Sequence, residues 1–320
     1  MKKGILALVM ALALCFGGCA KTEEPVVTQP VQTGRIATYA KIGDRFCAME
    51  PSELGAVGSE WVIVGLAQSG RLSQETAQSY LRAAESHVAE IGSDRLHKSK
   101  CTANVRLILA ITAAGGDVTD VAGFNLLAGL SDMSYVTKQG INGPIWALIA
   151  LDCGGYEPVA PMTRKALVDK ILSAQNEDGG WSLTKGESDA DVTAMALQAL
   201  APYREYGAQA VERGVAYLSA AQSADGGYMA YGLSTSEACA QVIVALTSLG
   251  IDPEGDQRFV KNGNSVVDAL LTFGVDGGFC HTMDNPQIDN VATEQGYYAL
   301  TAYHRFLSGD GALYDMTPIV

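Results

Sequence analysis

The sequence has few basic side chains and few histidines. Its 320 residues carry 22 lysines and arginines against 35 aspartates and glutamates, and only four histidines, for a net charge of −13. Such an acidic surface repels phosphate groups, so the composition excludes a nucleic-acid-binding protein. The low histidine count also limits metal sites, and we expect no cofactor.

Cysteine is too scarce and too irregularly spaced for a disulfide framework. Beyond the first nineteen residues an odd number of cysteines remains, with no repeated short spacing between them. They are Cys47, Cys101, Cys153, Cys239 and Cys280. At least one thiol should therefore be free unless it pairs with another chain.

The only candidate for a membrane-directed segment in our reading is the start of the chain. Lys2 and Lys3 precede the apolar run Ile5–Phe16, which is shorter than the ~20 residues of a bilayer-spanning helix. Two glycines and Cys19 follow. The pattern predicts a lipoprotein signal peptide over 1–19 with lipid attachment at Cys19, the alternative being an ordinary cleaved signal.

This prediction sets the expected location and domain order. The polar, proline-containing segment 20–33 has no periodicity and is typical of a flexible tether. We therefore expect a single folded domain over 34–320, anchored by lipid to the extracellular face of a bacterial membrane.

The alternation of apolar and polar residues that marks half-buried strands is missing after Gly34, whereas helical spacing recurs throughout. Six predicted helices are apolar on nearly all sides and should be buried: 58–69, 101–115, 141–152, 189–202, 236–249 and 290–307. Six others are amphipathic or more polar: 35–48, 73–91, 117–131, 160–174, 208–222 and 262–273. The two kinds alternate, which predicts an all-α fold, a closed α6/α6 toroid of six inner and six outer helices.

A recurrent turn supports this register. The segments 175–181, 222–228 and 273–279 read QNEDGGW, QSADGGY and FGVDGGF, and each follows a predicted outer helix. Glycine ends a helix in the left-handed conformation at little steric cost. The aromatic residue should then pack back and fix the turn.

These turns resemble the QW repeats of triterpene cyclases and the matching turns of protein prenyltransferase β subunits, although Phe273 replaces glutamine in the third copy. The stretches DVTAMALQALAPY and ATEQGYYALTAYHRF are similar to prenyltransferase-repeat domains of bacterial surface proteins. The resemblance extends to the toroid of intrinsic factor and transcobalamin, which bind cobalamin. It implies the toroid but does not choose between an enzyme and a binding protein.

The segment from Asp189 to Ala194, DADVTA, resembles the DxDDTA segment of class II terpene cyclases, with Val192 in place of the third aspartate. In that family the middle aspartate is the general acid, which implies this role for Asp191 with Asp189 beside it. The alternative is structural. Asp189 would cap the helix, and Asp191 would lie in its first turn, where the helix dipole favours an acid.

Resemblance to zinc prenyltransferases implies a second possible site. Their Asp-x-Cys pair falls on Glu237 and Cys239, but Gln295 stands where they have the histidine ligand. A neutral amide is a poor zinc ligand, so these two residues are weak metal candidates and we expect no metal.

Counting back along the inner helices places polar residues at equivalent starts and aromatic residues on the inner wall. Together they predict a polar mouth over an apolar cavity, which is typical of a ligand pocket. The candidate ligand-binding residues are Trp61, Asn142, Trp146, Glu237, Glu294, Gln295, Tyr297 and Tyr298.

These observations favour a non-catalytic binding domain on the cell surface. Its expected partners are the membrane, through the lipid, and a small hydrophobic molecule, a corrinoid, a glycan or a protein. The alternative is an isoprenoid-acting enzyme, either cyclase-like with Asp191 as the acid or a zinc-dependent transferase.

Overall fold

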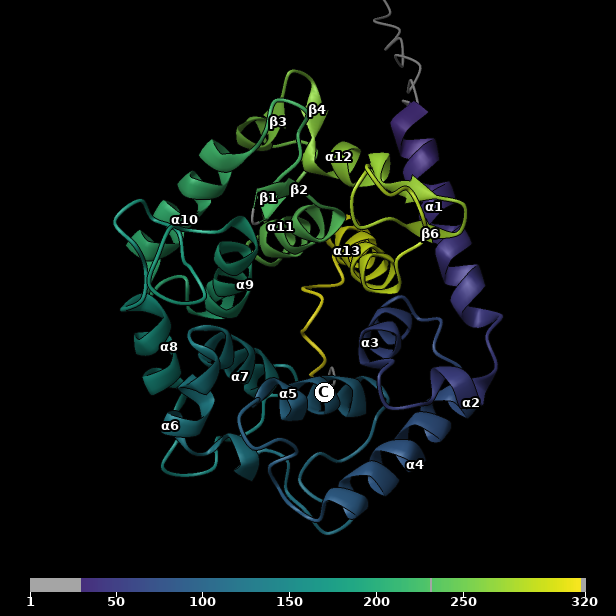
Figure 1. Ribbon diagram of the computed structural model, residues 1–320, viewed down its shortest axis with the longest axis vertical. Coiled ribbons are helices and arrows are strands. Elements are labelled where there is room, and N and C mark those ends of the chain that lie inside the picture. Colours follow the sequence, from purple (N-terminus) through teal and green to yellow (C-terminus); the bar gives the residue numbers. More distant parts are fainter. Residues whose placement is uncertain (1–29, 231, 318–320) are drawn as a thin grey trace, which may run out of the picture.

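The computed structural model describes residues 30–230 and 232–317, with side chains from residue 34 onward. Within this part, the helices form two concentric layers around a ring (Figure 1). The inner layer consists of α3 (Glu60–Gln68), α5 (Thr102–Ala113), α7 (Asn142–Asp152), α9 (Ala190–Leu200), α11 (Ser236–Ser248) and α13 (Asn290–Ser308). The outer layer consists of α1 (Pro30–Cys47), α2 (Pro51–Leu54), α4 (Gln74–Ile91), α6 (Met133–Val136), α8 (Arg164–Leu172), α10 (Ala208–Ala221) and α12 (Val266–Thr272).

The inner layer is closed. Each inner helix contacts the next one along the chain, and α13 contacts α3, the first of the series. The outer helix α1 packs against α12 and α13, so the beginning of the described chain covers the seam. The predicted all-α toroid is confirmed, and no open superhelical stack forms in the described part.

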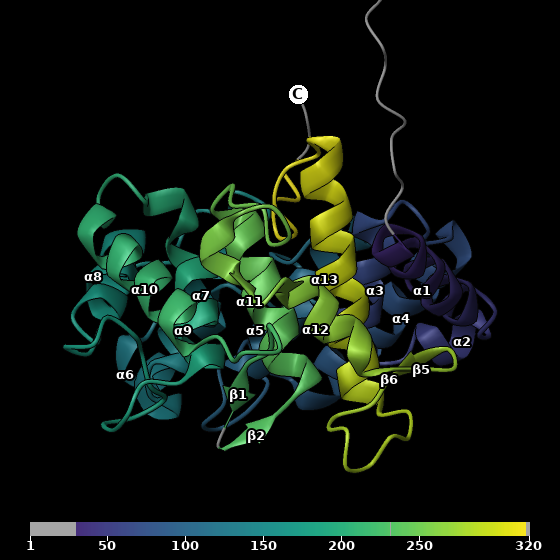
Figure 2. The same ribbon diagram turned by 90° about the horizontal axis from the view of Figure 1, so that it is seen from above.

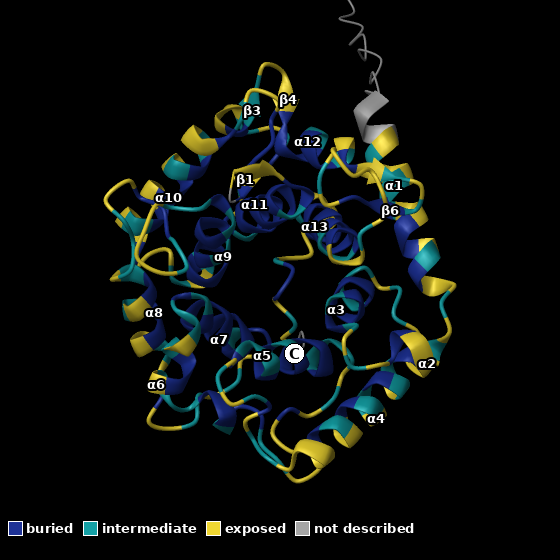
Figure 3. Cartoon of the chain, in the orientation of Figure 1, coloured by how far each residue is buried: buried dark blue, intermediate teal, exposed yellow. Residues whose placement is uncertain are grey.

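Burial follows the two kinds of helix that the sequence predicts. In α7 every residue from Gly143 to Leu151 is buried, whereas α4 buries one stripe that includes Tyr80, Ala84 and Val88. Figure 3 shows the same contrast around the ring, with buried inner helices and outer helices exposed on one side. A helix with one apolar stripe can cover the inner ring while its other face meets water.

One predicted outer helix does not form. The segment 117–131 consists of turns and a short 3-10 helix, Ala128–Leu130, and the brief α6 follows. Asp117 accepts from the Thr119 amide at 2.8 Å, and Asp120 accepts from the Gly123 amide at 3.0 Å. Side chains that bond to nearby amides in this way compete with helical hydrogen bonds, which the apolar spacing alone does not reveal.

Short hairpins interrupt the helices elsewhere. Their strands are β1 (Met229–Ala230), β2 (Leu233–Ser234), β3 (Val260–Lys261), β4 (Asn264–Ser265), β5 (Gly274–Val275) and β6 (Gly278–Phe279). The β3–β4 hairpin occupies the start of the predicted helix 262–273, because Asn262 and Gly263 both have positive φ and form its turn. The helix α12 begins only after Ser265, which forms a capping box with Asp268.

The start of α1 corrects the predicted tether. Pro30 is its first residue, so residues 30–33 are helical; proline suits this position because its φ is already near the helical value. The rest of the predicted tether and the signal peptide, including Cys19, lie outside the described residues. None of the described helices is long and apolar enough to cross a bilayer.

The glycines of the repeated turns have the predicted left-handed φ values, but they do not end the outer helices as predicted, because α8, α10 and α12 already end at Leu172, Ala221 and Thr272. Gly179, Gly226 and Gly277 have φ values of 93°, 85° and 83°. The aromatic residues that follow them, Trp181, Tyr228 and Phe279, are fully buried. The indole of Trp181 donates to the Ile171 carbonyl at 2.8 Å, so the side chain is bonded back to the preceding outer helix.

The third turn replaces its missing glutamine with an arginine from the other end of the chain. The side-chain amide of Gln222 donates to the Gly226 carbonyl at 2.9 Å, and Gln175 makes the same contact in the first turn. Arg45 of α1 donates to the equivalent carbonyl, that of Gly277, at 3.0 Å. The seam of the ring therefore keeps the hydrogen bond although Phe273 cannot supply it.

Residues 309–317, which we call the tail, enter the ring after α13 and run into its centre (Figures 1 and 2). Leu313 and Tyr314 of the tail are buried, and the Met316 amide donates to the Cys153 carbonyl at 2.9 Å. The tail thus closes the mouth at which the inner helices end. The opposite mouth, at which they begin, carries the predicted site.

Candidate functional site

The predicted polar residues gather at the mouth where the inner helices begin. Asn142, Asp191 and Glu237 lie in the first turns of α7, α9 and α11, and Glu294 lies in the second turn of α13. All four are partly buried. We call this end of the ring the acidic mouth.

The two aspartates of the DADVTA segment have different roles. Asp189 is the N-cap of α9, and its Oδ1 accepts from the amides of Asp191 and Val192 at 2.9 and 3.2 Å. The structural alternative is therefore confirmed for Asp189. Asp191 does not cap, and its buried Oδ1 has no hydrogen-bond partner within residues 30–230 and 232–317.

The carboxyl group of Asp191 is a weak acid in this setting. Burial, followed by the charges of Asp189 and Glu237, raises its pKa to about 7. His281 opposes this shift, but its Nδ1 is 2.9 Å from both carboxylate oxygens of Glu237. The nearest base is thus bound to the neighbouring acid, and Asp191 remains protonated in a large fraction of molecules at neutral pH.

Glu294, on another inner helix at the same mouth, is a weak acid for similar reasons. Burial is the main cause that raises the pKa of Glu294 to about 7; Glu60 and Asp289 contribute, and Arg106 opposes them. Arg106 is bound to Glu60, which is fully buried and also accepts from the Gly58 amide at 2.7 Å. Asp191 and Glu294 therefore each lie near a basic side chain that is already bound to another carboxylate: His281 is bound to Glu237, and Arg106 is bound to Glu60.

Glu60 was not among the predicted site residues, and its ion pair with Arg106 was not predicted either. They belong to α3 and α5, and only the packing of these two helices brings them together. A signal was nevertheless present, because a glutamate opening an otherwise apolar segment, EWVIVGLA, needs a partner once it is buried.

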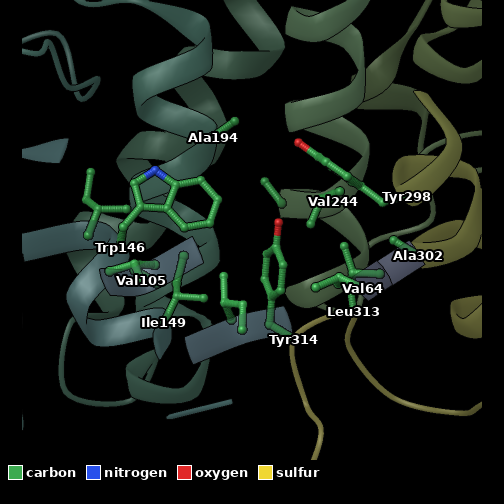
Figure 4. Packing of buried hydrophobic residues seen from close by; sticks show 14 of the residues in the cluster. Val64, Val105, Trp146, Ile149, Ala194, Val244, Tyr298, Ala302, Leu313 and Tyr314 are labelled. Carbon is green, nitrogen blue, oxygen red and sulfur yellow. The ribbon is translucent and has the colours of Figure 1, made fainter. Parts of the chain in front are cut away.

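Aromatic rings close the interior below the acidic mouth. Trp61 lies 5.2 Å from Trp146 and 5.7 Å from Tyr298, measured between ring centroids. Tyr314 of the tail completes the group, with centroids 6.4 Å from Trp61 and 5.9 Å from Trp146. Figure 4 shows Trp146 on one side of the Tyr314 side chain and Tyr298 on the other. The predicted wall residues Trp61, Trp146 and Tyr298 are thus brought together, and the tail supplies a fourth ring that the sequence did not predict.

A chain of buried amides crosses the same side of the interior. Gln198 of α9 donates to the side chain of Gln241 at 2.9 Å, and Gln241 donates to Gln295 at 2.9 Å and to Tyr298 at 2.7 Å. Gln295 thus belongs to an internal network. Gln198 and Gln241 were missed because single glutamines in an apolar helix give no indication of which way they face.

Tyr297 does not line the interior as predicted. Its ring stacks on Tyr39 and contacts Phe46 edge-on, with centroid distances of 5.4 and 5.3 Å, and its hydroxyl is 3.0 Å from that of Ser69. Adjacent residues of a helix point about 100° apart. Because Tyr298 faces the centre, Tyr297 faces α1.

Comparison with known proteins agrees with this architecture. A chain of the Candida albicans protein geranylgeranyltransferase-I complexed with GGPP aligns with a TM-score of 0.60 and 14% sequence identity, covering 84% of this chain and 91% of that one. Residues 131–236 match the family model of the squalene-hopene cyclase C-terminal domain. The chain is a terpenoid cyclase/prenyltransferase-like toroid. At this identity the structural match establishes the fold alone.

One curated relative of the toroid is the drimenyl diphosphate synthase of Streptantibioticus cattleyicolor (strain ATCC 35852 / DSM 46488 / JCM 4925 / NBRC 14057 / NRRL 8057). The two are 26% identical over 186 residues, which is 55% of this chain but only 31% of that protein. The match to the cyclase family model includes the first repeated turn, Asp189 and Asp191, and it ends before Glu237.

The residues of the toroid do not fit the zinc site that resemblance to prenyltransferases implies. Cys239 is fully buried, and burial raises its thiol pKa to about 12, which disfavours the thiolate that binds metal. Glu237 is already bound to His281. Within the described residues no group of three or more histidine, cysteine, aspartate or glutamate side chains is arranged to hold a metal ion.

Proposed function

We propose that this toroid is a lipid-anchored binding protein that holds an uncharged, largely apolar molecule, isoprenoid in character, at its acidic mouth. The observation that carries the proposal is the pair of weak acids, Asp191 and Glu294. The basic side chain near each of them is already bound to another carboxylate. Attachment through Cys19 to the extracellular face of the membrane is part of the proposal and rests on the signal sequence.

The acids favour a neutral ligand over an anionic one. A protonated carboxyl group donates a hydrogen bond, so Asp191 and Glu294 suit a hydroxyl, ether or carbonyl oxygen. A diphosphate would instead meet Glu237, Glu60 and Asp289, whose negative charges repel it. Arg106 and His281 would have to leave their carboxylates before they could neutralise such a group.

The aromatic rings favour an apolar body for the same ligand. Trp61 is only partly buried, and it connects the mouth to the rings of Trp146, Tyr298 and Tyr314. Since these rings meet in the centre, the ligand should rest on them at the mouth. Stacking and burial on aromatic faces supply affinity without charge.

Titration followed by tryptophan fluorescence tests the proposal. We expect farnesol to bind saturably at pH 6 and farnesyl diphosphate to bind at least tenfold more weakly. Trp61→Phe should remove most of the signal change, whereas Trp181→Phe should not, because the Trp181 side chain packs toward α8 and α10 and not into the interior of the ring. Tighter binding of the diphosphate would contradict the proposal. Cyanocobalamin in the same assay tests the corrinoid alternative, and native mass spectrometry of protein from its host tests for a retained ligand.

Acid catalysis is the second candidate, and the unpartnered Oδ1 of Asp191 is the observation that favours it. A neutral carboxyl group with its pKa near 7 can protonate an alkene or an epoxide. Incubation with farnesol, farnesyl diphosphate or squalene, with products identified by mass spectrometry, tests this role. Conversion that Asp191→Asn abolishes would establish an enzyme, whereas binding without conversion would leave the binding protein.

The anchor is tested separately in the host. Cys19→Ser should abolish incorporation of radiolabelled palmitate and move the protein from the membrane fraction to the medium. Incorporation that persists in Cys19→Ser would contradict attachment at this residue.

A further inference from the structure

Exposed apolar side chains gather beside the acidic mouth. Nine large apolar side chains are exposed in the described part of the chain, and five of them lie at this end of the ring. We call these five the apolar rim: Met229 and Leu233 of the β1–β2 hairpin, Met283 and Ile288 of the loop 280–289, and Val291 in the first turn of α13. The other four are scattered over separate outer elements and the far end of α13: Ile36, Ile91, Tyr206 and Leu307.

The hairpin and the loop are joined at the start of α11. Strand β2 leads into this helix, whose first residue, Ser236, donates from its amide to the His281 carbonyl at 3.2 Å and from its hydroxyl to the Cys280 carbonyl at 2.8 Å. The other end of the loop is held where Asp289 pairs with Phe279. Figure 2 shows both segments projecting from the side of the ring opposite the tail. The apolar rim is therefore one projecting surface.

We infer that the apolar rim docks the toroid on the surface of a lipid bilayer, with the acidic mouth facing the membrane. The inference rests on the proposed function for the anchor at Cys19 and for the apolar ligand. A gathering of exposed apolar side chains marks an interaction surface, and amphipathic surfaces bury such side chains at the boundary between headgroups and acyl chains. A ligand dissolved in the bilayer then reaches the mouth without crossing water.

The length of the chain between lipid and domain makes this second contact decisive for orientation. Ten residues, 20–29, separate Cys19 from Pro30, and ten extended residues reach at most ~35 Å. Helix α13 begins at the acidic mouth and ends at the covered one, and its 19 residues are about 28 Å long. The anchor therefore holds the domain beside the bilayer but lets either mouth face it. The apolar rim selects the acidic mouth.

The charges next to the apolar rim select the kind of lipid surface. Asp225 precedes the β1–β2 hairpin, Asp284 follows Met283, and both aspartates are exposed. Their negative charges disfavour anionic headgroups, so the rim fits a zwitterionic surface better. Docking then depends on burial of apolar side chains and not on charge.

Quenching of introduced tryptophans tests the inference. Full-length protein from its host is reconstituted into phosphatidylcholine vesicles, with or without a lipid that carries a doxyl quencher near the headgroup. Leu233→Trp and Leu307→Trp are matched, because both leucines are 52% exposed and lie at opposite ends of the ring. We expect the quencher to lower the emission added by Leu233→Trp roughly twofold or more, and to change that of Leu307→Trp little.

Two further variants show whether the apolar rim is the cause. Met283→Ser, combined with Leu233→Trp, should reduce the quenching, whereas Ile91→Ser, on the outer helix α4, should not. Unchanged quenching with Met283→Ser overturns the inference.

Flotation of the vesicles separates this inference from the proposals that it rests on. Equal quenching of the two tryptophan variants in protein that floats with the vesicles overturns the docking alone. Protein that does not float overturns the docking together with the anchor. The measurement contains no ligand, so a failure of farnesol to bind contradicts the proposed function and leaves the docking result standing.

Discussion

The two mouths of the ring use opposite ends of the same helices, and their backbone groups are satisfied differently. At the acidic mouth, side-chain oxygens of Asp189, Thr235 and Asp289 accept from the first amides of α9, α11 and α13. At the other mouth, Arg164 donates to the Leu151 carbonyl at 3.1 Å and Arg305 donates to that of Gln68 at 3.3 Å. This matches the helix dipole, which favours acids at helix starts and bases at helix ends.

The difference between the mouths concerns which of them the chain covers. The tail inserts Leu313 and Tyr314 into the ring from the side where the inner helices end. At the other side Asp191 and Glu294 are left with raised pKa values and without a base of their own. The covered mouth therefore contributes to stability, whereas the acidic mouth holds groups that reduce stability and suit binding.

Among these predictions, shortening the buried Leu313 side chain of the tail should have the largest effect on stability. Leu313 is fully buried, so Leu313→Ala should lower the free energy of unfolding by about 2 to 5 kcal/mol. Urea denaturation followed by circular dichroism measures the loss. Leu307→Ala, at a half-exposed position of α13, is the matched control and should change the stability by less than about 0.5 kcal/mol. Equal effects of the two variants would mean that the tail does not hold the covered mouth.

The periodicity of the sequence was sufficient to predict this ring but not its covering. Inner helices such as 141–152 were predicted closely because apolar residues occur on every side, and helix α7 spans Asn142–Asp152. The tail, GDGALYDMT, is too short to show a period, and its burial depends on the hole that the finished ring provides. No local pattern could have placed Tyr314 beside Trp61 and Trp146.

The candidate site also contains residues that the sequence predicted and residues that only the tertiary fold brings into place. Asp191 and Glu237 were predicted because they recur at equivalent positions of successive inner helices, and the structure brings them close enough to influence each other. The partners Arg106 and His281 come from another helix and from a loop, so their pairing with Glu60 and Glu237 requires the tertiary fold. Tyr297 was misplaced because adjacent helical residues with similar side chains cannot be ranked by sequence alone.

The second largest effect concerns the acidic mouth, where Asp191 should make the free energy of unfolding depend on pH. Burial raises the pKa of Asp191 from 3.8 to about 7, so the folded state binds a proton more tightly than the unfolded state. Stability from this group is then present at low pH and is lost as the pH rises from about 4 to about 7. Asp191→Asn should therefore raise the free energy of unfolding at pH 8 by roughly 1 to 3 kcal/mol and leave it nearly unchanged at pH 4.

Urea denaturation of both proteins at several pH values measures this effect. The informative quantity is the difference between wild type and variant, because groups that do not interact with Asp191 titrate equally in both. Asp178→Asn, in an exposed turn, is a control that should show no such pH-dependent gain. A gain that is equally large at pH 4 and pH 8 would show that Asp191 is not held as a weak acid.

The smallest expected effect distinguishes the role of Asp189, which caps α9, from that of Asp191, which is the weak acid. Asp189→Ala removes the cap of α9 and should cost about 1 kcal/mol, whereas Asp189→Asn keeps a capping oxygen and should cost only a few tenths. Both variants remove a negative charge beside Asp191, so both should lower its pKa by a fraction of a pH unit, because burial remains the larger cause. Carbon NMR titration of selectively labelled aspartate carboxyl groups measures the shift. An Asp191 pKa that does not change in Asp189→Asn would show that the charge of Asp189 does not weaken this acid, and that the cap contributes only to the helix.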